Sequence, residues 1–211
     1  YSNFVVDEIS MLSNEDKEKL IKRYPEHKII FCGDIGYQLP PIEGSEFKIG
    51  DIPVVHHKTN YRCECVKLQG ILNLMRKYIE IGLFGNNYEN FVKKLGFNII
   101  DEKDMDYSVE DMIICSTHKQ KDKYTKKYKH LEKYTVLENC RDFSNGDIII
   151  GSKPDRVRCE LRHAYTCHSV QGETAKNKLF IDIRGIRDMK MLYTSVSRCK
   201  RFEQIQFVKS I

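Results

Sequence analysis

The sequence contains no apolar segment long enough to cross a bilayer, and its first residues lack the charged, apolar and small-residue regions of a signal peptide. Membrane insertion and secretion therefore have no support in the sequence, and we expect an intracellular protein that does not bind membranes. The chain begins at Tyr1 rather than at a methionine. We accordingly expect it to be a piece of a longer polypeptide.

The patterns of two common kinds of chemical site are also missing. Four candidate zinc ligands fall within ten residues: His56, His57, Cys63 and Cys65. Their Cys-x-Cys spacing is tighter than that of a zinc knuckle and no second knuckle follows, so structural zinc is the weaker interpretation. No Ser-His-acid pattern typical of a nucleophilic hydrolase stands out. The eight cysteines are scattered, which favours free thiols in a reducing compartment over a disulfide framework.

The composition is that of an ordinary globular protein. Of 211 residues, 41% are hydrophobic and 31% are charged, which is enough to bury one large core or two modest ones. A net charge of +5, from 35 basic and 30 acidic residues, permits an anionic partner without requiring one. The abundance of Lys, Ile, Asn and Tyr is typical of AT-rich genomes and is compatible with a viral source.

The first fifty residues predict a strand, a helix and a second strand. An apolar run ends at Val6, and Ser13 with Asp16 three residues later forms a helix-start pair, while the helix should end before Pro25. The continuous apolar run at residues 27–34 predicts a strand covered on both faces of a parallel sheet.

Both predicted strands end in acidic residues, Asp7-Glu8 and Asp34. Because ligands gather at the carboxyl ends of parallel strands, we expect these acids to lie close together. The first acid of such a pair can bind a hydrated magnesium ion and the second can activate a water molecule. A solvated turn is the simpler explanation for an isolated Asp-Glu pair.

Five segments, in the correct order, resemble signature motifs of superfamily 1 helicases, particularly the RecD-like and Pif-like branch. They are VVDEISML from Val5, GDIGYQLPPI from Gly33, KTNYRCE from Lys58, AYTCHSVQGETA from Ala164 and MLYTSVSRCKR from Met191. The resemblance covers nearly the whole chain. It implies an α/β fold of RecA-like parallel sheets with flanking helices.

The resemblance also implies roles for individual residues, with ATP and Mg²⁺ as cofactors. The nucleotide side would comprise Asp7 as the magnesium ligand, Glu8 as the activator of water, Asp34 facing the nucleotide, Gln38 as the γ-phosphate sensor, Arg62 and Arg198 as arginine fingers, and Gly172 and Glu173 as cleft residues. The nucleic-acid side would comprise Thr117, Thr166, His168 and Ser169. Taken without the motifs, each arginine would be an ordinary surface or ion-pairing residue.

A basic helix is predicted in the middle of the chain. The strand-like run at residues 112–117 leads into a helix over 118–134, for which Thr117 and Gln120 offer capping groups. Tyr124, Tyr128 and Leu131 fall on one face, and the other face carries Lys119, Lys121, Lys123, Lys126, Lys127, Lys129 and Lys133. This face could follow a phosphate backbone, although a solvated amphipathic helix explains the pattern equally well.

The domain organisation follows from the resemblance. Residues 1–53 would be the carboxyl-terminal part of a first RecA-like motor domain, and residues 54–211 a nearly complete second one. The Asn145-Gly146 turn signal predicts a short hairpin insertion at about residues 140–160, after which a strand should run from Cys159 to Thr166. The alternating segment at residues 202–210 predicts an edge or half-exposed strand.

The sequence lacks the Gly-x-x-x-x-Gly-Lys-Thr/Ser loop that cradles nucleotide phosphates. In the family that this chain resembles, the loop precedes the Asp-Glu strand, so we expect the chain to begin partway through the first motor domain. Without the loop, the isolated chain should not hydrolyse ATP efficiently.

The whole protein would be an ATP-dependent helicase that translocates from 5′ to 3′ on single-stranded or forked DNA, as in replication or repair. Two alternatives remain open, an RNA helicase of the same superfamily and a non-hydrolysing nucleic-acid-binding module. Pro40 and Pro41 favour the DNA branch.

Overall fold

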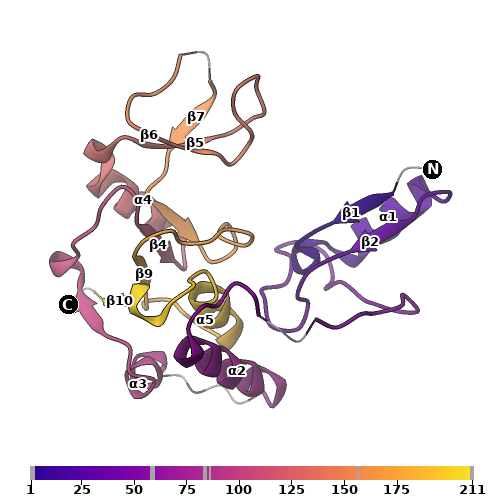
Figure 1. The fold of residues 1–211 in the computed structure, drawn as a ribbon, viewed down its shortest axis with the longest axis horizontal. Coiled ribbons are helices and arrows are strands. Elements are labelled where there is room, and N and C mark those ends of the chain that lie inside the picture. The colour runs from indigo at the N-terminus through magenta and orange to yellow at the C-terminus, as the bar shows by residue number, and fades with distance from the viewer. Residues whose placement is uncertain (1–2, 58–59, 83–84, 86, 156, 210–211) are drawn as a thin grey trace.

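A computed structural model describes residues 3–57, 60–82, 85, 87–155 and 157–209. Its indigo amino-terminal unit stands to one side of the rest of the chain in Figure 1. In this unit β1 (Phe4–Val6) pairs in parallel with β2 (Ile29–Phe31), and α1 (Asn14–Arg23) connects the two strands. Helix α1 begins where the Ser13 hydroxyl accepts a hydrogen bond from the Asp16 amide at 3.1 Å. The sequence prediction of this strand-helix-strand order is confirmed.

The β1–β2 pair is covered on one face only. Phe4 lies 4.8 Å from Tyr24 and Phe31 lies 5.3 Å from Phe47, measured between ring centroids. On the other face Val5 and its register partner Ile30 are 67% and 41% exposed. The predicted cover on both faces is therefore wrong for the described residues, because nothing in them packs against Val5 and Ile30.

The larger unit contains a five-stranded parallel sheet in the order β3-β10-β9-β4-β8. Its strands are β3 (Ile99–Asp101), β4 (Met112–Cys115), β8 (Ala164–Thr166), β9 (Leu179–Asp182) and β10 (Ile205–Lys209). The flanking helices are α2 (Val66–Glu80), α3 (Tyr88–Lys94), α4 (His118–Lys127) and α5 (Met189–Val196). The predicted fold class, parallel sheets with flanking helices, is confirmed.

Two hydrophobic clusters cover the two faces of this sheet. Residues of α2, α3 and α5 pack with Ile114, Ile181 and Phe207 on one face, while Tyr124 of α4 packs with Ile113 on the other. Successive residues of a strand thus belong to opposite clusters, because their side chains point to opposite faces of the sheet. Leu39, from the loop after β2, is 4% exposed and belongs to the first cluster, so this loop is anchored in the core of the larger unit.

Strand β10 is an inner strand, so of the two predicted alternatives, an edge or a half-exposed strand, the edge position is wrong, because β3 pairs along its outer side. The apolar residues of β3 are only Ile99 and Ile100, too short a run to be recognised from periodicity. The described residues also contain 3₁₀ turns at Ile9–Met11, Glu102–Asp104, Lys129–Leu131 and Phe202–Gln204. No helix among the described residues has the length and apolarity needed to cross a membrane.

The middle of the chain differs from its prediction. Helix α4 ends at Lys127, and Lys133 lies in β5 (Lys133–Val136), where it is 5% exposed and donates to the Asp111 carbonyl at 2.7 Å. Lys133 is therefore not part of a basic helix face. Burial lowers the pKa of this lysine to about 8.

A three-stranded antiparallel sheet forms in place of the predicted hairpin (Figure 1, top). Its central strand is β5, flanked by β6 (Ile148–Ile150) and β7 (Cys159–Leu161). The predicted strand from Cys159 to Thr166 is interrupted at residues 162–163, so its halves, β7 and β8, belong to different sheets. Both differences from the prediction arise because β5 pairs with β6 and β7, whereas β8 pairs with β4.

Candidate functional site

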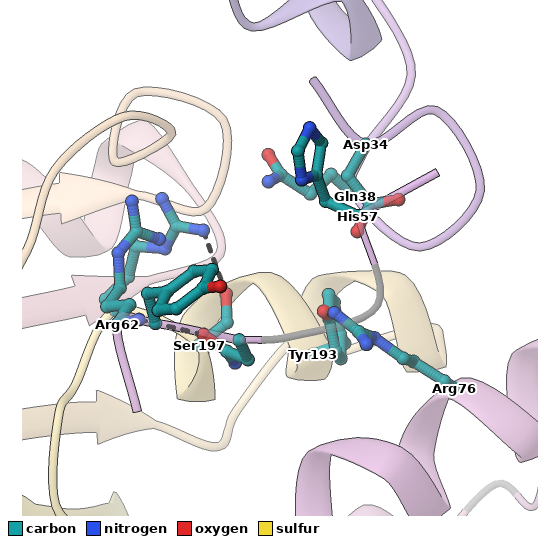
Figure 2. Close-up of a pocket in the computed structure, with 10 residues that line it drawn as sticks. Asp34, Gln38, His57, Arg62, Arg76, Tyr193 and Ser197 are labelled. Carbon is teal, nitrogen blue, oxygen red and sulfur yellow. Dashed lines mark hydrogen bonds between the residues drawn. The ribbon is translucent and has the colours of Figure 1, made fainter. Parts of the chain in front are cut away.

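A cavity of about 240 Å³ lies between the loop after β2 and helix α5 (Figure 2). It is lined by Asp34, Gln38, His57, Asn60, Tyr61, Arg62, Arg76, Tyr193, Ser197 and Arg198. Four of these residues were proposed from the sequence motifs, Asp34, Gln38, Arg62 and Arg198. The fold thus brings together side chains from three separate motifs.

The end of β1 has an unusual backbone. Glu8 adopts a left-handed conformation, with φ of 52° and ψ of 45°, although it is not a glycine. Its amide donates to Asp7 Oδ1 at 2.8 Å, and the Ile9 amide donates to the Cys32 carbonyl at 3.1 Å. Glu8 Oε2 is buried and has no hydrogen-bond partner among the described residues. Strained backbone and an unpartnered carboxylate oxygen are typical of functional sites.

The loops after β1 and β2 touch at Gly33. A β-carbon at this position would lie 2.7 Å from the Ile9 nitrogen, and the φ of Gly33 is +143°, so only glycine fits without a shift. Asp34 follows, and its Oδ1 accepts hydrogen bonds from the amides of Gly36 and Tyr37 at 3.2 and 3.0 Å. This turn fixes the loop that carries Gln38 into the cavity.

Two arginines form the opposite wall of the cavity. Arg198 is fully buried and donates to the carbonyls of Thr194 at 3.0 Å and Glu173 at 3.4 Å, and to the Ser197 hydroxyl at 2.9 Å. Burial, and then the charge of Arg62, lower the pKa of Arg198 to about 10, so it stays protonated at neutral pH.

No carboxylate of the described residues lies within ion-pair distance of Arg62 or Arg198. Two adjacent guanidinium groups without an acid partner favour an anion in the cavity.

The residues given a role from the sequence do not include Arg76 of α2 or Tyr193 of α5, although Tyr193 stands within the quoted segment MLYTSVSRCKR. The guanidinium of Arg76 lies 5.1 Å from the ring centroid of Tyr37 and 5.5 Å from that of Tyr193, and its Nε donates to the Tyr193 hydroxyl at 2.9 Å. The Tyr37 hydroxyl donates to Glu80, which raises the pKa of Tyr37 to about 12. No local pattern marked Arg76, because its partners are distant in sequence.

The loop after β8 is tightly folded around Thr166 and Ser169. The Thr166 amide donates to Ser169 Oγ at 2.9 Å, and the Ser169 amide donates to Thr166 Oγ1 at 3.2 Å. Thr166 is 7% exposed, so it holds the turn, whereas Ser169 is exposed. His168 is half-buried, and burial lowers the pKa of its ring, which therefore favours the neutral form.

The same loop then approaches Glu8 and Arg198. Gly172 has a φ of +83°, and a β-carbon there would lie 3.7 Å from Glu8 Oε1. The Glu173 carbonyl oxygen accepts a hydrogen bond from Arg198. The structure therefore gathers Gly172 and Glu173 beside residues that the motifs assigned to the nucleotide side, while their role in binding nucleotide stays a prediction.

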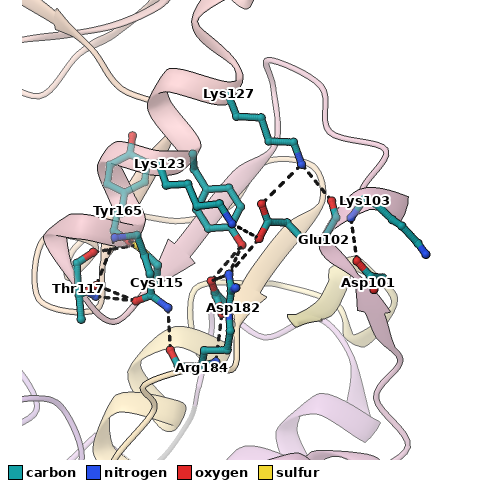
Figure 3. Close-up of polar contacts among 12 residues, drawn as sticks. Asp101, Glu102, Lys103, Cys115, Thr117, Lys123, Lys127, Tyr165, Asp182 and Arg184 are labelled. Atoms are coloured by element: carbon teal, nitrogen blue, oxygen red, sulfur yellow. Dashed lines mark hydrogen bonds and ion pairs between the residues drawn. The ribbon is translucent and has the colours of Figure 1, made fainter. Parts of the chain in front are cut away.

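Thr117 caps helix α4 at the end of β4. Its hydroxyl accepts from the Gln120 amide at 3.2 Å, and Gln120 Oε1 accepts from the Thr117 amide at 3.1 Å, a complete capping box. Gln120 in turn donates to the Arg184 carbonyl at 3.0 Å. Figure 3 shows Arg184 held by Asp182, and a 3.1 Å ion pair joins it to Glu102. Thr117 is exposed on this supported turn.

Thr117 and Ser169 follow neighbouring strands. Cys115 of β4 is the register partner of Thr166 of β8, and the Cys167 amide donates to the Cys115 carbonyl at 3.1 Å. Both exposed hydroxyl residues therefore follow the carboxyl ends of adjacent parallel strands, where ligands bind in such sheets.

The acidic residues fit a hydrated magnesium ion better than a metal enclosed by protein ligands. Asp7 is exposed, and no group of three or more His, Cys, Asp or Glu side chains suited to a metal forms among the described residues. Magnesium commonly keeps several waters and uses one or two carboxylates together with substrate phosphates. Asp7 offers one such ligand.

No protein-family model matches the chain, and no curated protein matches it. Solved structures of Pif1 helicases do. Bacteroides Pif1 bound to single-stranded DNA has a TM-score of 0.70 at 16% identity, over 99% of this chain and 71% of that one. Pif1 from Candida albicans has a TM-score of 0.67 at 14% identity, over 99% and 73%. A structure of two Pif1 helicases coordinating at forked double-stranded DNA has a TM-score of 0.68 at 16% identity, over 99% and 69%. The chain thus shares its fold with Pif1 helicases, as its motifs indicated.

Proposed function

We propose that this chain, which has the fold of Pif1 helicases, forms much of the motor of an ATP-dependent helicase that translocates from 5′ to 3′ on DNA. The observation that carries the proposal is the single cavity shared by Asp34, Gln38, Arg62 and Arg198. Three sequence motifs converge there. A matching Bacteroides Pif1 was solved in complex with ADP-AlF3 and single-stranded DNA, which supports a nucleotide and a DNA strand as the ligands.

On the nucleotide side, the residues around the cavity would divide the work of phosphoryl transfer. Arg62 and Arg198 would stabilise the negative charge that develops on the transferring phosphoryl group, since their guanidinium groups have no carboxylate partner among the described residues. Glu8 would orient and deprotonate the attacking water, and its buried, unpartnered Oε2 fits an acceptor waiting for that proton. Gln38 would contact the γ-phosphate.

Asp7 would hold Mg²⁺, which would neutralise negative charge on the nucleotide phosphates. Residues 1–53 would then belong to one motor domain and residues 54–211 to the second. Because no phosphate loop occurs in the 211 residues, residues outside them would have to supply it.

The strand-binding face would follow the ends of β4 and β8. Thr117 and Ser169 are exposed at these ends and could contact a phosphate backbone, and His168, next to Ser169 in the sequence, is half-buried. Thr166 would act indirectly by holding the turn. The exposed lysines of α4, among them Lys119 and Lys126, would add attraction for a polyanion that weakens with salt.

An RNA helicase and a non-hydrolysing nucleic-acid-binding module remain the alternatives, and the second is favoured by the missing phosphate loop. The decisive measurement uses the full natural protein that carries this sequence. ATP hydrolysis is measured with and without single-stranded DNA, and unwinding is compared on DNA and RNA duplexes with 5′ or 3′ tails. We expect stimulated hydrolysis, unwinding of 5′-tailed DNA, and a loss of about a thousandfold in hydrolysis for Arg198→Ala. Absence of stimulated hydrolysis in the natural protein would support the binding module instead.

A further inference from the structure

Gln171 reaches across the cavity region and contacts the loop that carries Gln38. Its Nε2 lies 3.2 Å from Gln38 Oε1, 3.3 Å from the Leu39 carbonyl oxygen and 3.2 Å from Ser10 Oγ. Ser10 follows the Asp7-Glu8 pair, and Gln171 directly precedes Gly172. One amide group therefore touches both loops of the amino-terminal unit from the loop after β8.

The chemistry of these partners fixes which way the Gln171 amide points. The Leu39 carbonyl oxygen can only accept hydrogen bonds, so the NH₂ group of Gln171 must face it, and the atom of the Gln38 amide beside the same NH₂ group must then be its oxygen. The opposite orientation would turn an oxygen toward two other oxygens. The two amide hydrogens can satisfy these two acceptors, and the Ser10 hydroxyl oxygen, 3.2 Å from the same nitrogen, is a third possible acceptor.

This contact also fixes the amide of Gln38. Because Gln38 Oε1 accepts from Gln171, the NH₂ group of Gln38 is the end left for the cavity, which Gln38 lines together with Arg62 and Arg198. Two N–H donors beside two guanidinium groups suit the oxygens of a phosphate group. A Gln38 amide without this partner could rotate and present its oxygen, which would repel the same phosphate.

The loop behind Gln171 is well anchored. Val170 is fully buried in the core, the Gln171 amide donates to the His168 carbonyl at 3.3 Å, and the turn at Thr166 and Ser169 closes the loop. A shift of Gln171 would therefore move the exposed end of the turn, where Ser169 lies.

We propose that Gln171 is a positioning residue that orients Gln38 for the terminal phosphate of the nucleotide. Through the same contact, the presence of that phosphate would change the position of the turn at Thr166 and Ser169, on the strand-binding face. The inference rests on the proposed function and adds to it a specific residue and contact. Coupling of this kind is reciprocal, so a bound strand would favour the same Gln38 orientation.

The test measures this coupling directly in the full natural protein. The dissociation constant for single-stranded DNA is determined with a non-hydrolysable ATP analogue and with ADP, and their ratio reports the coupling. Gln171→Met keeps the length of the side chain and removes the donor. Gln69→Met is the matched control, since Gln69 is a half-buried glutamine of α2 that does not line the cavity.

We expect the wild-type protein and Gln69→Met to bind DNA at least about fivefold more tightly with one nucleotide than with the other, a coupling of ordinary size. Gln171→Met should bring the ratio to within about twofold of unity, with a weaker affinity for the ATP analogue but unchanged affinity for ADP alone and for DNA alone. In a double-mutant cycle, Gln38→Met should add nothing to Gln171→Met.

Three outcomes would overturn the inference while leaving the proposed function intact: an unchanged ratio in Gln171→Met, an equal loss in Gln69→Met, or additive effects of the Gln38 and Gln171 substitutions. A wild-type protein that binds neither the ATP analogue nor DNA would overturn the proposed function itself.

Discussion

Arg76 donates its Nε hydrogen to the hydroxyl of Tyr193 at 2.9 Å while its guanidinium faces the ring of Tyr37. The three side chains come from α2, α5 and the loop after β2, and Arg76 and Tyr193 both line the cavity. Two aromatic neighbours hold the guanidinium in place, so its remaining N–H groups are available to a ligand in the cavity.

We therefore expect Arg76→Ala to weaken binding of a nucleoside triphosphate by about tenfold or more, because a charge-assisted contact would be lost. Arg76→Lys should restore little, since an ammonium group cannot stack between two rings in the same way. Fluorescence anisotropy of a labelled nucleotide measures both. Lys77→Ala, at the next position of α2 and outside the cavity, is the control, and equal weakening there would contradict a local role.

Gly33→Ala should destabilise the fold by about 1–3 kcal/mol, because the new β-carbon would lie 2.7 Å from the Ile9 nitrogen in a backbone conformation that favours glycine. Gly70→Ala is the counterpart. Gly70 lies within α2 with open space around it, so alanine should stabilise the helix by up to about 1 kcal/mol. Urea unfolding of both variants checks the prediction, which fails if the two substitutions have the same sign.

Thr117 can be tested for two roles at once. Thr117→Asp keeps a capping oxygen for the Gln120 amide and adds a negative charge, so stability should stay within about 0.5 kcal/mol while affinity for single-stranded DNA falls. Thr117→Val removes the cap and should cost about 1 kcal/mol. The measurements are thermal unfolding and DNA binding at two salt concentrations. Unchanged DNA affinity in Thr117→Asp would remove Thr117 from the strand-binding face.

His163 should make stability depend on pH. It is fully buried beside Lys133, His130 and Tyr107, and burial first, then the charges of Lys133 and His130, lower its pKa to about 4. Between the unfolded pKa near 6.5 and this value the unfolded chain binds more protons, so stability is complete above pH 6.5 and falls as pH drops toward 4. The loss amounts to roughly 3 kcal/mol at the low end.

The check is the free energy of unfolding from pH 7 to pH 4.5, with His163→Phe as the comparison. The variant removes the proton-binding site, so its stability should change less over this range whatever its stability at pH 7. Parallel pH curves for the two proteins would show that other groups cause the dependence.

Features set by neighbouring residues could be predicted from the sequence. The caps at Ser13 and Thr117 were predicted because the capping partner lies three residues away. The meeting of Gln38, Arg62 and Arg198 was predicted from the motifs that contain them. Such signals are local or belong to a recognisable segment.

The remaining features depend on partners that are distant in sequence. Lys133 has the composition of a helix surface residue, yet pairing of β5 with two later strands buries it. The inner position of β10 depends on β3, and the role of Arg76 depends on Tyr37 and Tyr193. Gln171 lies within a quoted motif, but its role depends on a contact with Gln38, which is distant in sequence.

The burial of Leu39 limits how the two units can move. Its side chain sits in the core of the larger unit, although it belongs to the loop after β2. Separating the loop from that core would expose a leucine, at a cost of about 1.5–3 kcal/mol. An opening between the units would therefore have to expose Leu39 or leave the loop after β2 with the larger unit, and in the second case Gln38 would stay beside Gln171.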